Sequence, residues 1–213
     1  MKFIHITADD IQNMDQRYRV SFVNSLSGFK SANLLGTADS DGATNLAMVS
    51  SVVHLGADPA LMGMVTRPRS VARHSVENLV QTGVFTLNHV AAELVPQAHQ
   101  TSARYPKDVS EFDHTGLTPE WNNGFAAPRV AESKLSIGLE VREIKHLEIN
   151  NTELIIGEIQ WVYLAGEALQ EDGFIDLISL GTVCVSGLDC YHTSPSHMGR
   201  LSYAKPDRDP DWR

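Results

Sequence analysis

The segment GATNLAMVSSV, residues 42–52, has the alternating pattern of a β-strand, but small polar side chains interrupt it. It follows the turn signal Asp41-Gly42. Residues two apart share a strand face, which gives Asn45, Ala47, Val49 and Ser51 on one face and Leu46, Met48, Ser50 and Val52 on the other. The second face is mostly apolar and predicts a core contact. The first face would let a flat ligand lie close to the backbone, although a half-exposed strand gives the same pattern.

Further strand patterns dominate the chain around this segment. They cover residues 31–38, 45–54, 60–66, 84–90, 135–149 and 153–164, with a weaker pattern at 175–185. Asn150-Asn151 is a hairpin turn signal between the two longest strands. The regular alternation of strands and helices that marks a parallel sheet is missing. We therefore expect a mainly β (α+β) protein, an antiparallel barrel with short helical insertions.

A few helices are expected between the strands. Ser70 is a candidate N-cap for a helix over residues 71–81, whose apolar positions form one stripe and which ends at Gly83. Short helices are also expected at residues 91–103 and 109–112.

One long irregular segment lies between these helices and the late hairpin. Residues 116–128, GLTPEWNNGFAAP, are rich in Gly, Pro and Asn. We expect an ordered excursion rather than a linker, because Trp121 and Phe125 need burial. The polar tail KPDRDPDWR, residues 205–213, is too polar to fold alone. We expect residues 1–213 to form a single domain.

Composition narrows the class of protein. The 213 residues are 42% hydrophobic, enough for one full core. The chain shows neither a signal peptide nor an apolar stretch of membrane-spanning length, so we expect a soluble, cytoplasmic protein. The net charge of −9 argues against binding to nucleic acid or to anionic membranes. Cys184 and Cys190 would stay reduced in the cytosol, and without CxxC or HExxH spacing no metal site is expected.

Residues 66–75, TRPRSVARHS, concentrate positive charge in this acidic chain. The basic residues are Arg67, Arg69, Arg73 and His74, and the hydroxyls are Thr66, Ser70 and Ser75. If Ser70 caps the helix, free backbone N–H groups and the positive end of the helix dipole lie at the same place. Such a set would bind a phosphate well. A solvated helix face whose arginines pair with acids such as Glu77 would give the same charge pattern.

The polar strand face and the basic cluster together suit a ring system that carries a phosphate. The chain lacks the GxGxxG, GxxxxGK[ST] and GxSxG motifs of other nucleotide-binding or hydrolytic sites. Flavin mononucleotide (FMN) is therefore the cofactor that we expect.

The chain resembles the flavin reductase-like, FMN-binding split-barrel family over roughly residues 17–191. The pieces that carry the resemblance follow one another in the family's order. They are SGFKSANLLGTADSDGATNLAMVSSVVHLGADPALMGMVTRP (27–68), RHSVENLVQTGVFTLNHV (73–90), TSARYPKDVSEFDHTGLTP (101–119) and LEVREIKHLEINNTELIIGEIQWVYL (139–164). The resemblance implies an antiparallel split β-barrel and a homodimer with FMN near the subunit interface.

The resemblance also implies roles for particular residues. The ring and ribityl chain would lie against Asn45, Ala47, Ser50 and Ser51. The phosphate would be held by Arg67, Arg73, His74 and Ser75, where the family often has Thr in place of Ser75. Ser102 and Arg104 would close the site from another side, although a helix cap and a surface charge would explain them equally well. No separate catalytic residue is expected, because the cofactor carries the chemistry.

Three functions fit this sequence. The first is an NAD(P)H:flavin oxidoreductase, which passes a hydride from the nicotinamide to flavin N5 and could supply reduced FMN to a partner monooxygenase. The second is a flavoredoxin-type FMN electron carrier that takes electrons from a protein. The third is a non-enzymatic split-barrel module that binds haem or pyridoxal phosphate, with His54, His89 or His99 as the axial ligand of a haem.

Ser50 gives conflicting signals. Strict alternation turns its side chain toward the core, whereas the resemblance places it at the flavin. A bulge or a strand end at this position would reconcile the two.

Overall fold

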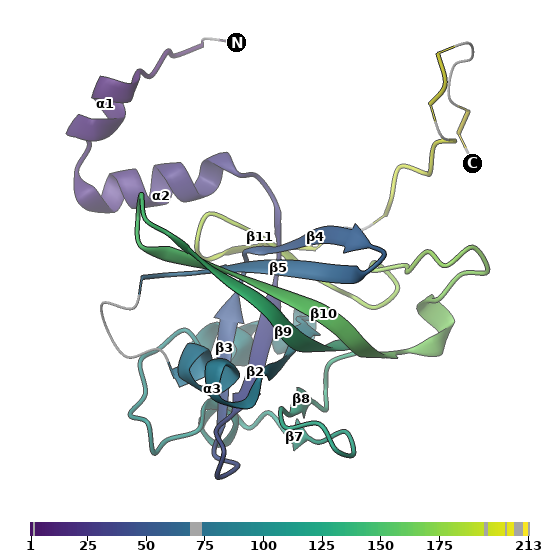
Figure 1. Ribbon diagram of the computed structural model, residues 1–213. Helices are drawn as coiled ribbons and strands as arrows, with labels where there is room; N and C mark the ends of the chain where they lie inside the picture. The colour runs from purple at the N-terminus through teal and green to yellow at the C-terminus, as the bar shows by residue number, and fades with distance from the viewer. Residues whose placement is uncertain (2, 69–73, 194–195, 203, 207–210, 213) are drawn as a thin grey trace.

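A seven-stranded antiparallel sheet forms the centre of the protein (Figure 1). The computed structural model describes residues 1, 3–68, 74–193, 196–202, 204–206 and 211–212. The strand order is β3-β2-β6-β9-β10-β5-β4. Their bounds are β2 (Asn33–Ala38), β3 (Thr44–Val49), β4 (Val52–Ala57), β5 (Ala60–Thr66), β6 (Val84–His89), β9 (Leu135–Leu147) and β10 (Thr152–Leu164). These bounds confirm the expected antiparallel β architecture.

The strands β3 and β4 follow each other in the chain but lie at opposite edges of the sheet. Only Ser50 and Ser51 connect them, so the sheet curls until its two edges approach. The edges are not hydrogen-bonded to each other, and the barrel stays split. The single strand expected over residues 45–54 was therefore wrong. It is two strands, because its first half pairs with β2 and its second half with β5.

Alternate residues of the strands fill the barrel interior. This interior cluster includes Leu35, Met64, Phe85, Leu139 and Ile155, all almost fully buried. The intervening residues face outward, where a second cluster that includes Leu34, Leu46 and Phe112 packs under the helices. The core contact predicted for Leu46 and Met48 is thus confirmed, but it lies in the outer cluster and not in the barrel interior. Val49, on the face expected to meet a ligand, packs against the interior cluster instead.

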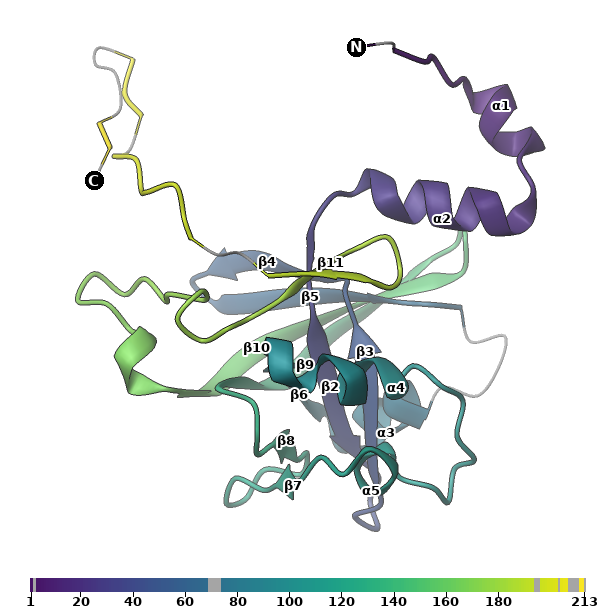
Figure 2. The same ribbon diagram turned by 180° about the vertical axis from the view of Figure 1, so that it is seen from behind.

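Short helices cover β2 and β3 (Figure 2). They are α3 (His74–Thr82), η1 (Ala92–Leu94), α4 (Val95–Gln100) and α5 (Glu111–Thr115). The side chain of Leu79 on α3 joins the interior cluster, and Asn78 Nδ2 donates to Thr37 Oγ1 at 3.3 Å. The helix α3 therefore closes one end of the barrel. As expected, it ends before Gly83, whose φ is +74°. The predicted N-cap Ser70 lies outside the described residues.

The excursion at residues 116–128 is ordered, as expected. It forms β7 (Pro119–Glu120) and leads into β8 (Arg129–Val130). The ring of Phe125 contacts that of Trp161 edge to face, with centroids 5.2 Å apart. The burial expected for Trp121 was wrong, since 46% of this side chain is exposed.

A small sheet lies beside the main one. It joins β1 (Lys30–Ser31), β11 (Cys184–Ser186) and β12 (Cys190–His192) in the order β1-β11-β12. The strand expected over residues 175–185 is mostly turn, and only β11 at its end is extended. The chain between β10 and β11 also contains η2 (Gly166–Ala168).

Two N-terminal helices were not predicted. They are α1 (Ala8–Asn13) and α2 (Gln16–Leu26), which extend away from the barrel in Figure 1. Thr7 and Asp10 form a capping box at α1, and the Asp15 carboxylate accepts hydrogen bonds from the Arg17 and Tyr18 amides at α2. Neither helix has a buried residue. Among the described residues, no helix is long and apolar enough to cross a membrane.

Candidate functional site

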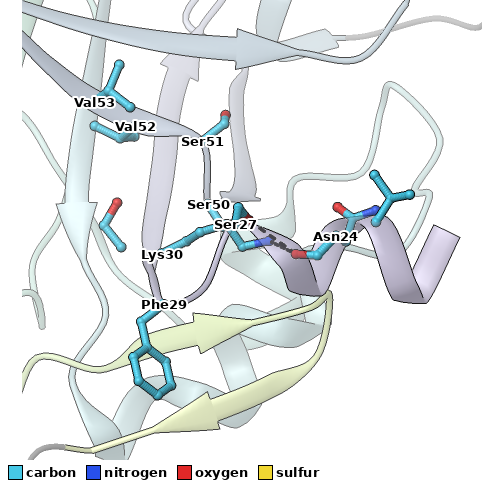
Figure 3. Close-up of a pocket in the computed structure, with 10 residues that line it drawn as sticks. Asn24, Ser27, Phe29, Lys30, Ser50, Ser51, Val52 and Val53 are labelled. Atoms are coloured by element: carbon cyan, nitrogen blue, oxygen red, sulfur yellow. Dashed lines mark hydrogen bonds between the residues drawn. The ribbon is translucent and has the colours of Figure 1, made fainter. Parts of the chain in front are cut away.

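The connection between β3 and β4 opens onto a cavity of about 590 Å³ (Figure 3). One wall comes from the end of α2 and the chain leading to β1, and the other from residues 50–53. Val23, Phe29 and Val52 make the walls partly apolar, while Ser31 and Ser50 add hydroxyls. Apolar walls with a few polar groups are typical of small-molecule sites.

Lys30 holds in place the cavity wall formed by the end of α2 and the start of β1. Its amine donates hydrogen bonds to the carbonyl oxygens of Asn24 at 3.1 Å and Gly187 at 2.7 Å. Figure 3 shows the contact with Asn24. The Phe29 ring meets the His192 ring edge to face, with centroids 4.8 Å apart. The cavity is therefore built where the N-terminal segment, the small sheet and the barrel meet.

Ser50 and Ser51 lie at the predicted strand end. Because β3 ends at Val49, strict alternation does not continue through Ser50, and this residue lines the cavity. The Ser51 hydroxyl donates to the Val65 carbonyl of β5 at 2.6 Å, which ties the connection to the strand next to the far edge of the sheet. The structure thus resolves the conflict at Ser50 in favour of a strand end.

A second group of predicted residues meets at the start of α3. The Ser75 hydroxyl donates a short hydrogen bond to Asn45 Oδ1. Asn45 Nδ2 and the Leu46 backbone N–H both donate to Glu111 Oε2, at 2.6 and 2.9 Å. The Asn45 side chain is only 8% exposed. Asn45 and Ser75 therefore lie together, but the Asn45 amide is already bonded and positions α3 against β3.

Ala47 lies half-buried on β3 between these two groups and pairs with Leu35 of β2. At the rise of a β-strand, Asn45 and Ser50 are about 17 Å apart along the chain. An elongated ligand with a polar group at one end would follow this edge strand. Because Ala47 lies directly across from Leu35 of the interior cluster, its side chain is on the interior face of β3, and its contact with a ligand stays a prediction.

The basic cluster is only partly described. Arg67 is exposed just after β5, and His74 is the first residue of α3. The predictions for Arg73, Arg69 and Ser70 lie outside the described residues. The adjoining Thr66 Oγ1 is buried and has no hydrogen-bond partner among the residues that the structure describes. An unsatisfied buried hydroxyl beside an exposed arginine fits an anionic group such as the FMN phosphate.

Ser102 and Arg104 are exposed in the turn that follows α4. The Ser102 backbone N–H donates to the His99 carbonyl at 3.0 Å, so its backbone helps to end that helix. In the described part of the chain, neither side chain is hydrogen-bonded to Asn45 or Ser75. Their role at a ligand stays a prediction.

The three histidines considered as haem ligands lie on different elements. His54 is on β4, His89 ends β6, and His99 on α4 bonds through Nδ1 to the Tyr191 hydroxyl at 2.9 Å. No group of three His, Cys, Asp or Glu side chains in the described residues is arranged to hold a metal ion.

Sequence reasoning missed several residues of this region. Glu111 was assigned only to a short helix, since nothing local indicates a contact with Asn45, 66 residues away. Phe29 and Ser31 line the cavity because the N-terminal segment folds back there, and no motif marks them. The hydroxyl of Thr66 lay in the basic cluster, but its lack of a partner is visible only in the structure.

An antiparallel barrel that is split between β3 and β4, with a helix closing one end, defines a split-barrel protein. The model of the flavin reductase like domain family matches residues 26–178. The chain therefore belongs to the flavin reductase-like family, and its function involves a flavin.

Solved structures agree with this assignment. A proposed flavin reductase with a split-barrel domain from Shewanella frigidimarina NCIMB 400 is 54% identical, with a TM-score of 0.91 over 95% of this chain and 100% of that one. Two more distant structures share the fold. Nitrilotriacetate monooxygenase component B from Bacillus cereus is 17% identical, with a TM-score of 0.81 over 94% of this chain and 100% of that one. Flavoredoxin of Desulfovibrio vulgaris (Miyazaki F) is 21% identical, with a TM-score of 0.71 over 81% of this chain and 91% of that one.

Proposed function

We propose that this protein binds FMN and acts as an NAD(P)H:flavin oxidoreductase. Two observations together carry the proposal: the cavity at Ser50 and Ser51, and the buried Thr66 hydroxyl next to Arg67, which has no hydrogen-bond partner in the described part of the chain. Membership of the flavin reductase-like family and the 54% identical relative support it.

The chain's own residues would bind and orient the cofactor. The ring system would lie at the cavity, where Ser50 and Ser51 offer hydroxyls and Val52 an apolar surface. The phosphate would lie toward the start of α3, near Arg67 and His74. The hydrogen bonds of Asn45 to Ser75 and Glu111 would hold that helix start in place. The flavin, when bound, supplies the capacity to accept a hydride and pass electrons on.

No general acid or base is needed for hydride transfer between two stacked rings. The protein's contribution is to exclude water, align the rings and offer hydrogen-bond donors to the charge that develops on the reduced flavin. Donors near the ring edge, such as the Ser50 hydroxyl, would favour the anionic reduced form.

The visible spectrum of the purified protein tests this proposal. We expect a flavin spectrum, directly or after addition of FMN, that bleaches when NADH or NADPH is added without oxygen. A protein that binds FMN but keeps its colour with both nucleotides would contradict the reductase function while leaving the flavin site intact.

That second outcome would favour a flavoredoxin-type electron carrier. The similarity in fold to the Desulfovibrio flavoredoxin makes this the leading alternative. A colourless protein that takes up no FMN, or one with a haem or pyridoxal band, would instead point to a non-enzymatic binding module.

We also propose that the protein works as a homodimer and hands electrons to a monooxygenase or another electron-transfer partner. The support for a dimer is the uncovered apolar surface of α2, where Tyr18, Val20, Val23 and Leu26 are all exposed. An isolated helix of this length is marginal without packing. Light scattering after size exclusion should give twice the chain mass, and a monomer would contradict the dimer.

A further inference from the structure

The two ends of the barrel interior differ in chemistry. At the end closed by α3, Leu79 inserts among the strands, and the buried polar side chains of Asn78 and Thr37 are hydrogen-bonded to each other. At the other end Asn33 and His89 face the interior, and Ser31 of β1 lies two residues before Asn33; we call these three residues the polar layer. Asn33 shares the interior face with Leu35, and His89 shares it with Leu87, because side chains two apart point the same way.

Every member of the polar layer has an unsatisfied buried atom. Ser31 Oγ, Asn33 Nδ2 and His89 Nδ1 have no hydrogen-bond partner among the described residues. Asn33 is only 1% exposed, so its amide is shielded from bulk water. Leaving such groups unpaired costs about 1–3 kcal/mol each. Three unsatisfied polar atoms at one end of the barrel indicate a binding site whose hydrogen bonds are completed by a ligand.

The polar layer adjoins the cavity at the strand break. Asn33 lies directly across from His89 on β6 and from Val49 on β3, the residue before Ser50. Ser31 itself lines the cavity. Val52 both lines the cavity and packs against the interior cluster. The polar layer therefore lies next to the cavity, and Ser31 is the member of the layer that lines it.

The side chains of the polar layer favour an uncharged ligand group. Burial lowers the pKa of His89 to about 4, so its ring is uncharged at neutral pH. The Asn33 amide nitrogen needs an acceptor such as a carbonyl oxygen. The neutral imidazole and the Ser31 hydroxyl can each donate or accept. A charged group would pay a large cost to enter beside them without a counter-ion.

We propose that Ser31, Asn33 and His89 form a subsite, reached from the cavity past Ser31, for a neutral amide-like group, one that presents a carbonyl oxygen next to an N–H. This subsite rests on the proposed function. Under that function two ligands carry the group, the pyrimidine ring of the flavin and the carboxamide of the nicotinamide.

Two variants remove the hydrogen-bonding atoms with little change in shape. Ser31→Ala deletes an unsatisfied buried hydroxyl, and Asn33→Leu replaces the amide by an apolar group of similar size. Ser136→Ala is the matched control, because the Ser136 hydroxyl is also buried and unpartnered. It lies on the opposite side of β9 from the interior residues Leu135 and Ile137.

The measurements are FMN affinity of the apo-protein and affinity of the FMN-loaded protein for oxidised nicotinamide nucleotides, both by calorimetry. Loss of one hydrogen bond should weaken one of these affinities by about three- to tenfold in Ser31→Ala and in Asn33→Leu. A change in FMN affinity identifies the flavin as the source of the amide-like group. A change in nucleotide affinity alone identifies the nicotinamide.

Thermal unfolding of the apo-proteins provides a readout that does not depend on activity. Ser31→Ala should be at least as stable as the wild type, since it removes an unpaired group. If the layer only holds water or supports the fold, Ser31→Ala is destabilised and both affinities match the Ser136→Ala control, which overturns the subsite alone. A wild-type chain that binds no flavin would overturn the proposed function and the subsite together.

Discussion

The Ser75 hydroxyl donates a hydrogen bond to the side-chain oxygen of Asn45, and this contact fixes the first turn of α3 to β3. The Asn45 amide passes the contact on to Glu111 of α5. The two donors in this series of hydrogen bonds are the Ser75 hydroxyl and the Asn45 amide nitrogen, and their acceptors are Asn45 Oδ1 and Glu111 Oε2. These contacts hold the start of α3 in place next to the basic cluster. The proposed function puts the FMN phosphate at this part of the site.

Ser75→Ala should loosen the start of α3 and leave Asn45 Oδ1 without a donor. We expect a loss of about 1 kcal/mol in the free energy of unfolding and FMN binding weakened by about three- to tenfold. Urea unfolding and FMN titration measure the two effects. Ser75→Thr keeps the hydroxyl and should behave nearly as the wild type. If Ser75→Thr and Ser75→Ala lose equal affinity, the hydrogen bond is not the cause.

Two arginines of the basic cluster, Arg67 and Arg73, should act on the phosphate. Arg67→Ala and Arg73→Ala should each weaken FMN binding by about ten- to hundredfold, the value of a charge-assisted hydrogen bond. Binding of riboflavin, which lacks the phosphate, should change little. Arg142→Ala is the control, because this arginine pairs with Glu140 and Glu158 on the sheet surface. Equal losses for FMN and riboflavin would show that the arginines act elsewhere.

His89 makes the stability depend on pH. Burial lowers its pKa from 6.5 to about 4, so in this window the unfolded chain binds a proton that the folded chain does not. The free energy of unfolding should therefore fall as the pH drops from 6.5 toward 4, by about 3 kcal/mol for the full shift.

Chemical denaturation of the wild type and of His89→Gln across this pH range isolates the effect, because all other titrating groups are shared. The variant should lack the His89 part of the slope. Parallel pH profiles for the two proteins would mean that His89 is accessible to protons in the folded state.

Gly138 leaves room for the Trp161 ring across the β9–β10 pair. A Cβ at this position would lie 2.1 Å from that ring, so the tryptophan would have to move and disturb its contact with Phe125. We expect Gly138→Ala to cost about 1–3 kcal/mol in the free energy of unfolding. Gly166→Ala is the control, because nothing lies within 4 Å of a Cβ there. A Gly138→Ala protein as stable as this control would contradict the packing described.

The sequence predicts the strands well because one face of each strand is buried and the alternation is visible. The division into β3 and β4 was not predicted, since it depends on pairing with β2 and β5 rather than on local pattern. Likewise α1 and α2 lack a buried apolar stripe, and only their capping residues mark them. Local sequence patterns predict an element well where burial of one face determines the pattern. They predict it poorly where pairing with a distant strand, or helix capping, determines the structure.

The candidate site shows the same division. Ser50 and Ser51 were expected at a ligand and do border the cavity. Asn45 and Ser75 were expected at one site and do meet, but their bond to each other could not be inferred from residues 30 positions apart. The unpaired atoms of Thr66 and Asn33 carry no sequence signal, because their lack of partners is a property of packing.

Equilibrium binding of FMN to the purified protein, with riboflavin as the comparison, tests the central claim most directly. We expect FMN to bind with a dissociation constant of about 1 μM or lower and riboflavin to bind at least about tenfold more weakly, because the phosphate adds charge-assisted hydrogen bonds at the start of α3. If FMN does not bind at micromolar concentration, the flavin site described for this chain is wrong.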